Sequence, residues 1–175
     1  MNRRLLAGLV LTVALAGLAL LSLVWTPEPP TRMHIALKLL PPLAPGLPAS
    51  FGWLGTDQFG RDLLSMLMAG AWNSLLVALP AVALGGGLGA ALGIAAAGRG
   101  GLLDAVAMRA CDTVFAVPPI LSALMLGTLL GPGRATAVAA IAVFLVPVFA
   151  RVARGGALTV WASDYVMAAL SLIHI

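Results

Sequence analysis

Four apolar segments, separated by polar or proline-rich stretches, dominate the hydrophobicity pattern of the chain. The first runs from Leu5 to Val24, and the others cover about 74–97, 114–130 and 135–149. A helix of about twenty residues, rising about 1.5 Å per residue, crosses the hydrocarbon core of a bilayer, which is roughly 30 Å thick. The fourth segment is short for a span unless it extends through the turn at 131–134. We therefore predict an all-α membrane protein with four transmembrane helices.

The first apolar segment has two possible interpretations. Arg3 and Arg4 precede it, and a basic start followed by an apolar stretch is also typical of a cleaved signal peptide. The stretch is longer than a typical signal core, however, and the following Trp25-Thr26-Pro27 lacks the small residues of a cleavage site. We favour an uncleaved membrane anchor.

Residues 26–73 differ in composition from the apolar segments on either side. Seven of the twelve prolines lie within residues 26–50, which forbids a continuous helix and predicts an irregular loop. The glycines and acids of residues 51–62 predict a compact turn, and Asp62 can cap a helix that starts near Leu63. A short helix at the membrane interface is expected next, from the apolar residues Leu63, Leu64, Met66, Leu67 and Met68.

Small residues recur every four positions along the second apolar segment. They are Ala81, Gly85, Gly89, Gly93 and Ala97. Such a row lies on one face of a helix and lets a neighbouring helix approach closely, although alanine and glycine are also simply abundant here. A phosphate-binding interpretation of residues 85–87 is rejected, because no strand precedes them and no GK[ST] ending follows.

Charged residues separate the later segments. A loop is expected around Arg99, Asp104, Arg109 and Asp112, before the third span. Pro118 and Pro119 near the start of that span are tolerated there, because a first-turn N–H has no helical partner. A tight turn at 131–134 follows, and Arg151 and Arg154 end the fourth span.

Composition narrows the class of protein. The chain is 61% hydrophobic and only 9% charged, against roughly 25% charged in soluble domains, so lipid must cover much of its surface. Its ten Lys and Arg residues occur singly or in pairs, which does not favour nucleic-acid binding. Cys111 is the single cysteine, and His34 and His174 lie far apart without ligand-forming neighbours. No metal site is expected.

Basic residues also indicate the orientation. With a cytoplasmic N-terminus, six basic residues fall on inner segments: Arg3, Arg4, Arg99, Arg109, Arg151 and Arg154. Four fall on outer segments: Arg32, Lys38, Arg61 and Arg134. Because basic residues on short loops stay inside, this topology is preferred.

No constellation of catalytic residues is visible. Ionisable residues are absent from the middle of every predicted span, and Asp104 and Asp112 fall in the expected cytoplasmic loop. An aspartate-type intramembrane protease would need both acids within the membrane, and a serine type would need a base inside a span. The chain is therefore not expected to be an enzyme, and its work is expected to be mechanical.

Several motifs resemble one family. Residues 53–65 read WLGTDQFGRDLLS, which resembles the GTDxxGRDxxS signature of the peptide and nickel branch of binding-protein-dependent ABC importer permeases. Residues 108–112, followed by Pro118, resemble the MRxxDxxxxxP stretch of that family. Residues 147–154 resemble its PxxARxxR segment, and residues 164–169 look like the start of its cytoplasmic EAA loop. The similarity runs from about residue 1 to residue 169.

The resemblance implies a bundle of six helices in the bacterial inner membrane. It implies four kinds of partner: a second permease subunit, ATPase subunits that bind the ATP, an external substrate-binding protein, and lipid. No cofactor is expected in this chain. Tyr165, Ala168 and Ala169 would belong to the ATPase contact. The external-loop residues Gly55, Thr56, Asp57, Gly60, Arg61 and Asp62 would shape their loop or meet the binding protein.

Two departures from the family pattern stand out. Gly52 occupies a position that often holds histidine in the family, and Ile173 stands where the EAA pattern has glycine. Residues 170–175 fit no part of the family's continuation. A C-terminally truncated or mis-assembled reading frame is expected, the alternative being a naturally short subunit.

The expected organisation has four parts. Residues 1–25 form the cytoplasmic end and first span, and 26–73 the external loop with its interfacial helix. Residues 74–154 form the permease core, and 155–175 begin a cytoplasmic coupling loop. The predicted function is a permease subunit of an ATP-driven importer for peptides or nickel. The alternative is a membrane scaffold, or a remnant fragment, that does not transport.

Overall fold

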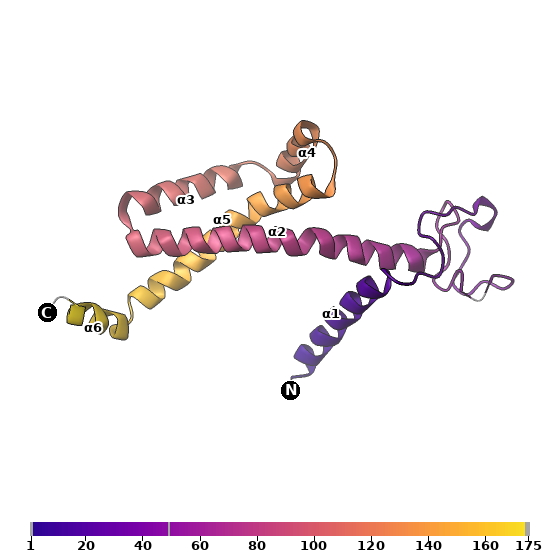
Figure 1. The fold of residues 1–175 in the computed structure, drawn as a ribbon, viewed down its shortest axis with the longest axis horizontal. Helices are drawn as coiled ribbons and strands as arrows, with labels where there is room; N and C mark the ends of the chain where they lie inside the picture. The colour runs from indigo at the N-terminus through magenta and orange to yellow at the C-terminus, as the bar shows by residue number, and fades with distance from the viewer. Residues whose placement is uncertain (1, 49, 174–175) are drawn as a thin grey trace. The chain divides into compact units, whose positions relative to one another are not determined.

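The protein is all-helical, as the apolar pattern predicts. A computed structural model describes residues 2–48 and 50–173 (Figure 1). Within those ranges no strand occurs, only an isolated antiparallel bridge between Thr56 and Asp62. The helical elements, in chain order, are α1 (Arg3–Leu21), η1 (Ile35–Leu37), α2 (Leu63–Arg99), α3 (Gly101–Ala116), α4 (Pro119–Leu130), α5 (Arg134–Trp161) and α6 (Asp164–Ile173). They fall into two compact units, Met1–Leu76 and Val77–Ile175.

Three helices of the described chain, α1, α2 and α5, are long and apolar enough to cross a membrane. A fourth span exists if α3 and α4, which meet at a bend of 86°, count as one. Large apolar side chains face outward along these helices, for example Leu11, which is 71% exposed, and Leu88, which is 63% exposed. Such surfaces are stable in lipid rather than in water. The chain is a multi-pass membrane protein.

The first unit consists of α1, the proline-rich loop and the start of α2. Between α1 and α2 the short turn η1 is the only helical element among the described residues. The loop is closed by backbone bonds between distant segments, such as Thr56 N–H to Leu40 O at 3.1 Å and Leu43 N–H to Gly52 O at 3.1 Å. Proline-rich backbone lacks donors for a regular ladder, so isolated bonds of this kind hold it.

The separate interfacial helix predicted over residues 63–68 is wrong. Those residues are the first turns of α2, which continues for 37 residues to Arg99. Nothing between the two predicted elements stops a helix: Gly70 costs about 1 kcal/mol, and Pro80 is accommodated inside α2. At about 1.5 Å per residue this helix is longer than the bilayer core is thick.

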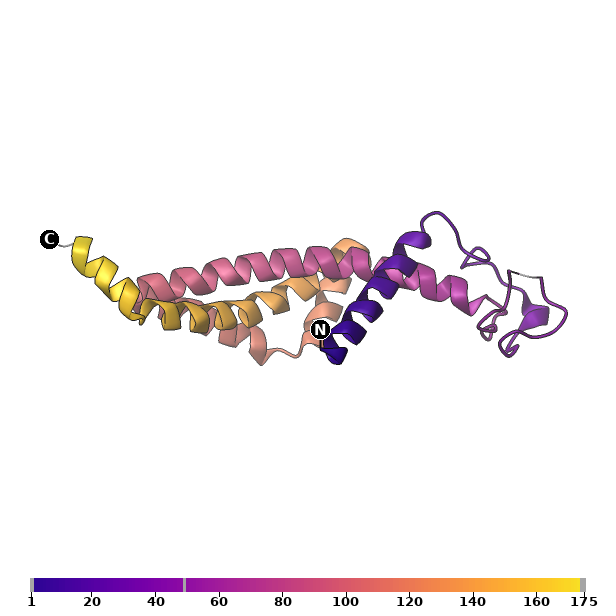
Figure 2. The same cartoon turned by 90° about the horizontal axis from the view of Figure 1, so that it is seen from below.

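The second unit is built around α5. Helices α3 and α4 both pack against α5, and α2 runs beside it (Figures 1 and 2), with Gly85, Gly89 and Gly93 at the contact. Its buried hydrophobic residues are small: Ala81, Ala96, Ala107, Cys111, Ala140, Ala142 and Ala150. Small side chains bring helix backbones close together, which is how helices associate in membranes.

The loop predicted around Arg99, Asp104, Arg109 and Asp112 is helical instead. Arg99 ends α2, and the three others lie in α3. The link between the two helices is only Gly100, and both Gly100 and Gly101 have positive φ values, 60° and 55°. Glycine adopts this backbone conformation without strain, so two residues suffice for the turn.

The predicted third span, 114–130, is broken. Helix α3 ends at Ala116 and α4 begins at Pro119. Val117 (φ −97°, ψ 127°) and Pro118 (φ −56°, ψ 132°) are both extended. Each precedes a proline, and a residue before proline is pushed out of the helical region. Two such residues in succession end one helix before another can begin.

The predicted end of the fourth span at Phe149 is also wrong, because α5 runs on to Trp161. Arg151 and Arg154 lie inside this helix rather than beyond it, and so do residues 155–161, which were expected to open the coupling loop. Ion pairs to α3 satisfy both arginines, so their charge does not terminate the helix. The shorter α6 follows after a break at residues 162–163.

Candidate functional site

The small-residue row of α2 lies in the second unit, and its three glycines face α5. Ala81 is fully buried, Gly85, Gly89 and Gly93 are also buried, and Ala97 is partly buried. A Cβ atom on Gly85 would lie 2.5 Å from the Leu145 Cβ, closer than real side chains approach.

The next two glycines of the row, Gly89 and Gly93, lie even closer to the backbone of α5. A Cβ on Gly89 would overlap Val146 O, and a Cβ on Gly93 would overlap Ala150 O. The obstructing atoms are backbone, which cannot rotate away as a flexible side chain can. By contrast, Gly87 has no atom within 4 Å of its would-be Cβ. Close contact between α2 and α5 therefore depends on three glycines in register.

Two ion pairs join α3 to α5 on the same unit. Arg154 holds Asp104 with two bonds, Nε to Oδ1 at 2.5 Å and Nη2 to Oδ2 at 2.6 Å. Arg151 pairs with Asp112 through its Nη2, and its guanidinium carbon lies 4.6 Å from the centre of the Phe115 ring. A two-bond contact fixes the direction as well as the distance of the pair.

The pairs connect motifs that are far apart in the chain. Asp104 and Arg154 are 50 residues apart, and Asp112 and Arg151 are 39 apart. The family-like stretch at 108–112 is thus tied to the stretch at 147–154. The Asp104–Arg154 pair is the more enclosed, with side chains 22% and 31% exposed, against 56% and 48% for Asp112 and Arg151.

The loop motif of residues 55–62 lies in the first unit and forms a turn closed by its own side chains. Asp57 Oδ1 accepts from the backbone N–H groups of Phe59 at 2.8 Å and Arg61 at 2.9 Å. Asp57 Oδ2 accepts from the Arg61 Nε at 2.8 Å. Gly60 completes the turn with a φ of 72°, and a side chain there would collide with His34 O.

Asp62 joins this turn to α2. Its Oδ2 accepts from the Ser65 N–H at 2.8 Å and the Ser65 hydroxyl at 2.6 Å, which caps the helix that begins at Leu63. Its Oδ1 accepts from the Gly52 N–H at 2.9 Å. Asp62 is 2% exposed and Ser65 is fully buried. A buried carboxylate requires such a set of donors, because an unpaired one is costly.

Thr56 ties the motif to the proline-rich loop. Its hydroxyl donates to Leu37 O at 2.5 Å and accepts from the Leu40 N–H at 2.9 Å. Gly55 has a φ of 85°, and a Cβ there would lie 2.5 Å from Leu40 O. The four polar residues of the expected site are thus all bonded within the first unit, namely Thr56, Asp57, Arg61 and Asp62.

Acidification is expected to open the Asp57 turn. Partial burial alone would raise the Asp57 pKa, but the hydrogen bonds from the Arg61 backbone and side chain and from the Phe59 N–H outweigh it and hold the pKa below its usual range. The stabilisation is therefore fully present above the unfolded pKa, about 3.9, and is lost as pH falls through the folded value. When the pH is lowered below about 4, the Phe59 and Arg61 amides should become less protected from hydrogen exchange. In the Asp57→Asn variant, protection should already be low at pH 7 and change little; equal protection in both proteins would contradict this role.

The residues expected to contact an ATPase lie in α6, Tyr165 near its start and the two alanines in its middle. Tyr165 is 68% exposed, and Ala169 is also exposed. Ala168 lies on the same short helix. Residues 174–175, with His174, lie outside the described part of the chain.

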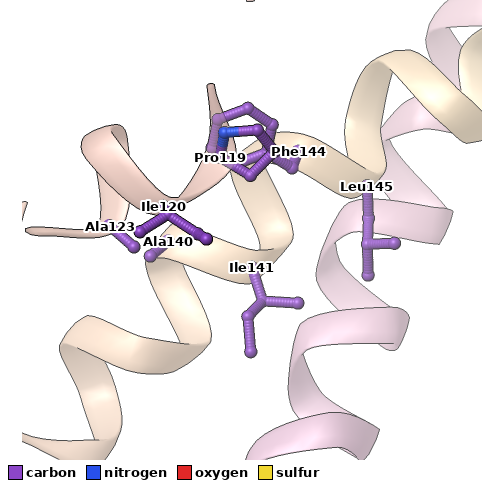
Figure 3. Close-up of a pocket in the computed structure, with 7 residues that line it drawn as sticks. All are labelled: Pro119, Ile120, Ala123, Ala140, Ile141, Phe144 and Leu145. Atoms are coloured by element: carbon purple, nitrogen blue, oxygen red, sulfur yellow. The ribbon is translucent and has the colours of Figure 1, made fainter. Parts of the chain in front are cut away.

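The second unit also contains an apolar cavity between α4 and α5. It has a volume of about 320 Å³, and Figure 3 shows side chains from both helices around it. Its lining residues are Pro119, Ile120, Ala123, Ala140, Ile141, Phe144 and Leu145. None of these lining residues carries a titratable or nucleophilic side chain. Within the described ranges, no cluster of three potential metal ligands exists either.

Sequence reasoning missed two features of these sites. Ser65 was part of the quoted signature but not of the expected site, and no local signal marks it, because the capping box has Glu or Gln rather than serine three residues after the cap. The pairing of Asp104 and Asp112 with arginines of α5 had no local signal, because it depends on which helices become neighbours.

Comparison with known proteins identifies the family. Residues 89–172 match the family described as binding-protein-dependent transport system inner membrane component. The chain is 37% identical over 171 residues to a probable D,D-dipeptide transport system permease of Escherichia coli K12, covering 94% of this chain and 55% of that protein. It is 38% identical over 125 residues to a glutathione transport system permease of Pectobacterium atrosepticum, covering 71% and 42%. A dipeptide transport system permease of Haemophilus influenzae is 34% identical over 167 residues, covering 94% and 56%.

The chain spans about half the length of the curated relatives it matches. The family match covers the last part of α2, the whole of α3, α4 and α5, and most of α6, and the alignment with the first relative covers 94% of the chain. The resemblance predicted from the sequence motifs is confirmed, and the family is one of transport permeases, not enzymes. The chain belongs to the inner-membrane components of binding-protein-dependent transport systems, and its curated relatives are permeases of dipeptide and glutathione transport systems.

Proposed function

We propose that this chain is a transmembrane subunit of an ATP-driven importer for peptides, and that it forms part of the translocation pathway. The observation that carries the proposal is the alignment of 94% of the chain with peptide permeases. Peptides are preferred to nickel because these relatives are named for dipeptides and glutathione. The absence of a titratable group from the cavity between α4 and α5 supports passage rather than chemistry.

The same proposal assigns partners to surfaces. A second permease subunit would complete the pathway, and ATPase subunits would dock at α6, where Tyr165 and Ala169 are exposed. An external binding protein would deliver substrate on the side of the loop formed by residues 26–62. The internal bonds of that loop support a shaping role for its motif, with Asp57 and Asp62 as the centres.

A cytoplasmic N-terminus is part of the proposal. Of ten basic residues, six then lie on the cytoplasmic side. Two of the six, Arg151 and Arg154, are paired with aspartates. Because acids contribute little to the positive-inside rule, these pairs leave the preference intact.

The decisive experiment is co-purification from native membranes in mild detergent. We expect an ATP-binding cassette subunit to elute with the tagged chain, and the Ala169→Arg variant to lose it, because a long charged side chain would disturb a close helix contact. The matched variant Ala36→Arg changes an exposed alanine of the loop and should retain the ATPase. A chain that purifies without any ATPase, or with it in both variants equally, would contradict the proposal.

A further inference from the structure

The loop of the first unit contains a cavity with one polar and one apolar wall. Its volume is about 240 Å³. The polar wall consists of Glu28, Arg32 and His34, and the apolar wall of Leu37, Pro48 and Phe51. A few convergent polar groups beside an apolar surface are typical of small-molecule sites. Neither the motif nor the helix contacts of the second unit explains this arrangement.

The charged groups on the polar wall have unused bonding capacity. Arg32 Nη1 lies 2.9 Å from Glu28 Oε1, and His34 Nε2 lies 3.6 Å from the same oxygen. No hydrogen bond to Glu28 Oε2 is made within the described chain, and Arg32 uses one of its five N–H donors. One more cation can therefore be accepted at Glu28, and one more anion at Arg32.

The Glu28 backbone and the His34 ring are held in place by contacts within the first unit. The Glu28 N–H donates to the Ser65 hydroxyl at 3.0 Å, and Ser65 is bonded to the buried Asp62. The His34 ring packs edge-on against Phe51, with the ring centres 5.4 Å apart, and Phe51 is only 6% exposed. A site held in place in this way loses little entropy on binding.

We propose that this cavity binds a small zwitterion with an apolar side chain. Its ammonium group would pair with Glu28, its carboxylate with Arg32, and its side chain would lie against Leu37 and Phe51. The volume limits the ligand to an amino acid or a short peptide, two sources of the same chemistry. Binding needs no ATPase; only the idea that the ligand is then transported rests on the proposed function.

Titration calorimetry of the full chain in detergent micelles tests the site. The probes are L-leucine, L-leucyl-L-alanine and N-acetyl-L-leucinamide, which keeps the side chain but carries no charge. At least one of the two zwitterions should bind at least about 10-fold more tightly than the blocked compound, because each charge-assisted hydrogen bond is a strong one. Binding of leucine alone would assign the site to free amino acids, and binding of the dipeptide alone to peptides.

Variants separate the site from a general effect on the fold. Arg32→Gln and Glu28→Gln should each weaken binding of the zwitterion about 10-fold. The Arg32 side chain is 62% exposed, so its replacement tests the site without disturbing the loop. Lys38→Gln, an exposed change in the same loop outside the cavity, should leave binding unchanged. Equal binding of the blocked compound, unchanged binding in Arg32→Gln, or no binding of either zwitterion would overturn the proposal, whatever the ATPase experiment shows.

Discussion

Replacing Gly93 with leucine is expected to destabilise the second unit by about 3 kcal/mol or more, at the upper end of the cost of overpacking a core. Even a Cβ at this position would overlap Ala150 O, and it would lie 2.9 Å from the Arg154 backbone nitrogen. Helix α2 would have to move away from α5. The loss should appear as a lower midpoint of thermal unfolding in micelles, followed by circular dichroism.

The same helix offers a matched control for this substitution. Gly87 is exposed and has open space around its would-be Cβ, so Gly87→Leu should be neutral or slightly stabilising, because leucine favours helix over glycine. Equal losses in Gly93→Leu and Gly87→Leu would show that α2 and α5 do not meet through this row.

Reversing one charge of the Asp104–Arg154 pair is the second change with a large expected effect. Asp104→Arg places two cations where one bidentate pair stood, and it should lower the thermal midpoint clearly. The double variant Asp104→Arg/Arg154→Asp restores opposite charges and should recover more than half of that loss. Reversing the charge of Asp112 should lower the thermal midpoint less than Asp104→Arg does, because both side chains of the Asp112–Arg151 pair are about half exposed. If the thermal midpoint of the double variant is no higher than that of Asp104→Arg, the pair does not hold α3 to α5.

These two contacts show what could and could not be derived from the sequence. The row from Ala81 to Ala97 needs only the helical period and the absence of side chains to predict a close contact face. The partner helix is not encoded in that row, and α5 was identified only in the structure. Likewise, the acids and glycines of residues 55–62 predict a turn, because their side chains bond locally.

The errors came from interactions that extend beyond a local window. Arg151 and Arg154 look like the end of a span when read alone, yet pairing with α3 lets α5 continue to Trp161. At Pro118, two consecutive residues that precede proline produce the bend of 86°, whereas each proline alone would fit a helix start. A continuous α2 was missed because a change in polarity was taken for a change of element.

Site-specific cross-linking tests the central claim most directly. Cys111 is the single cysteine and is 2% exposed, so a Cys111→Ala background allows one reactive thiol to be introduced at a time. A cysteine at Ala169, on α6, should cross-link to an ATP-binding cassette subunit in native membranes. A cysteine at Gln58, in the loop turn, should not. An ATPase adduct at position 169 alone is the predicted result; an adduct at position 58, or none at 169, would contradict the proposed role of α6 as the ATPase contact of a peptide permease.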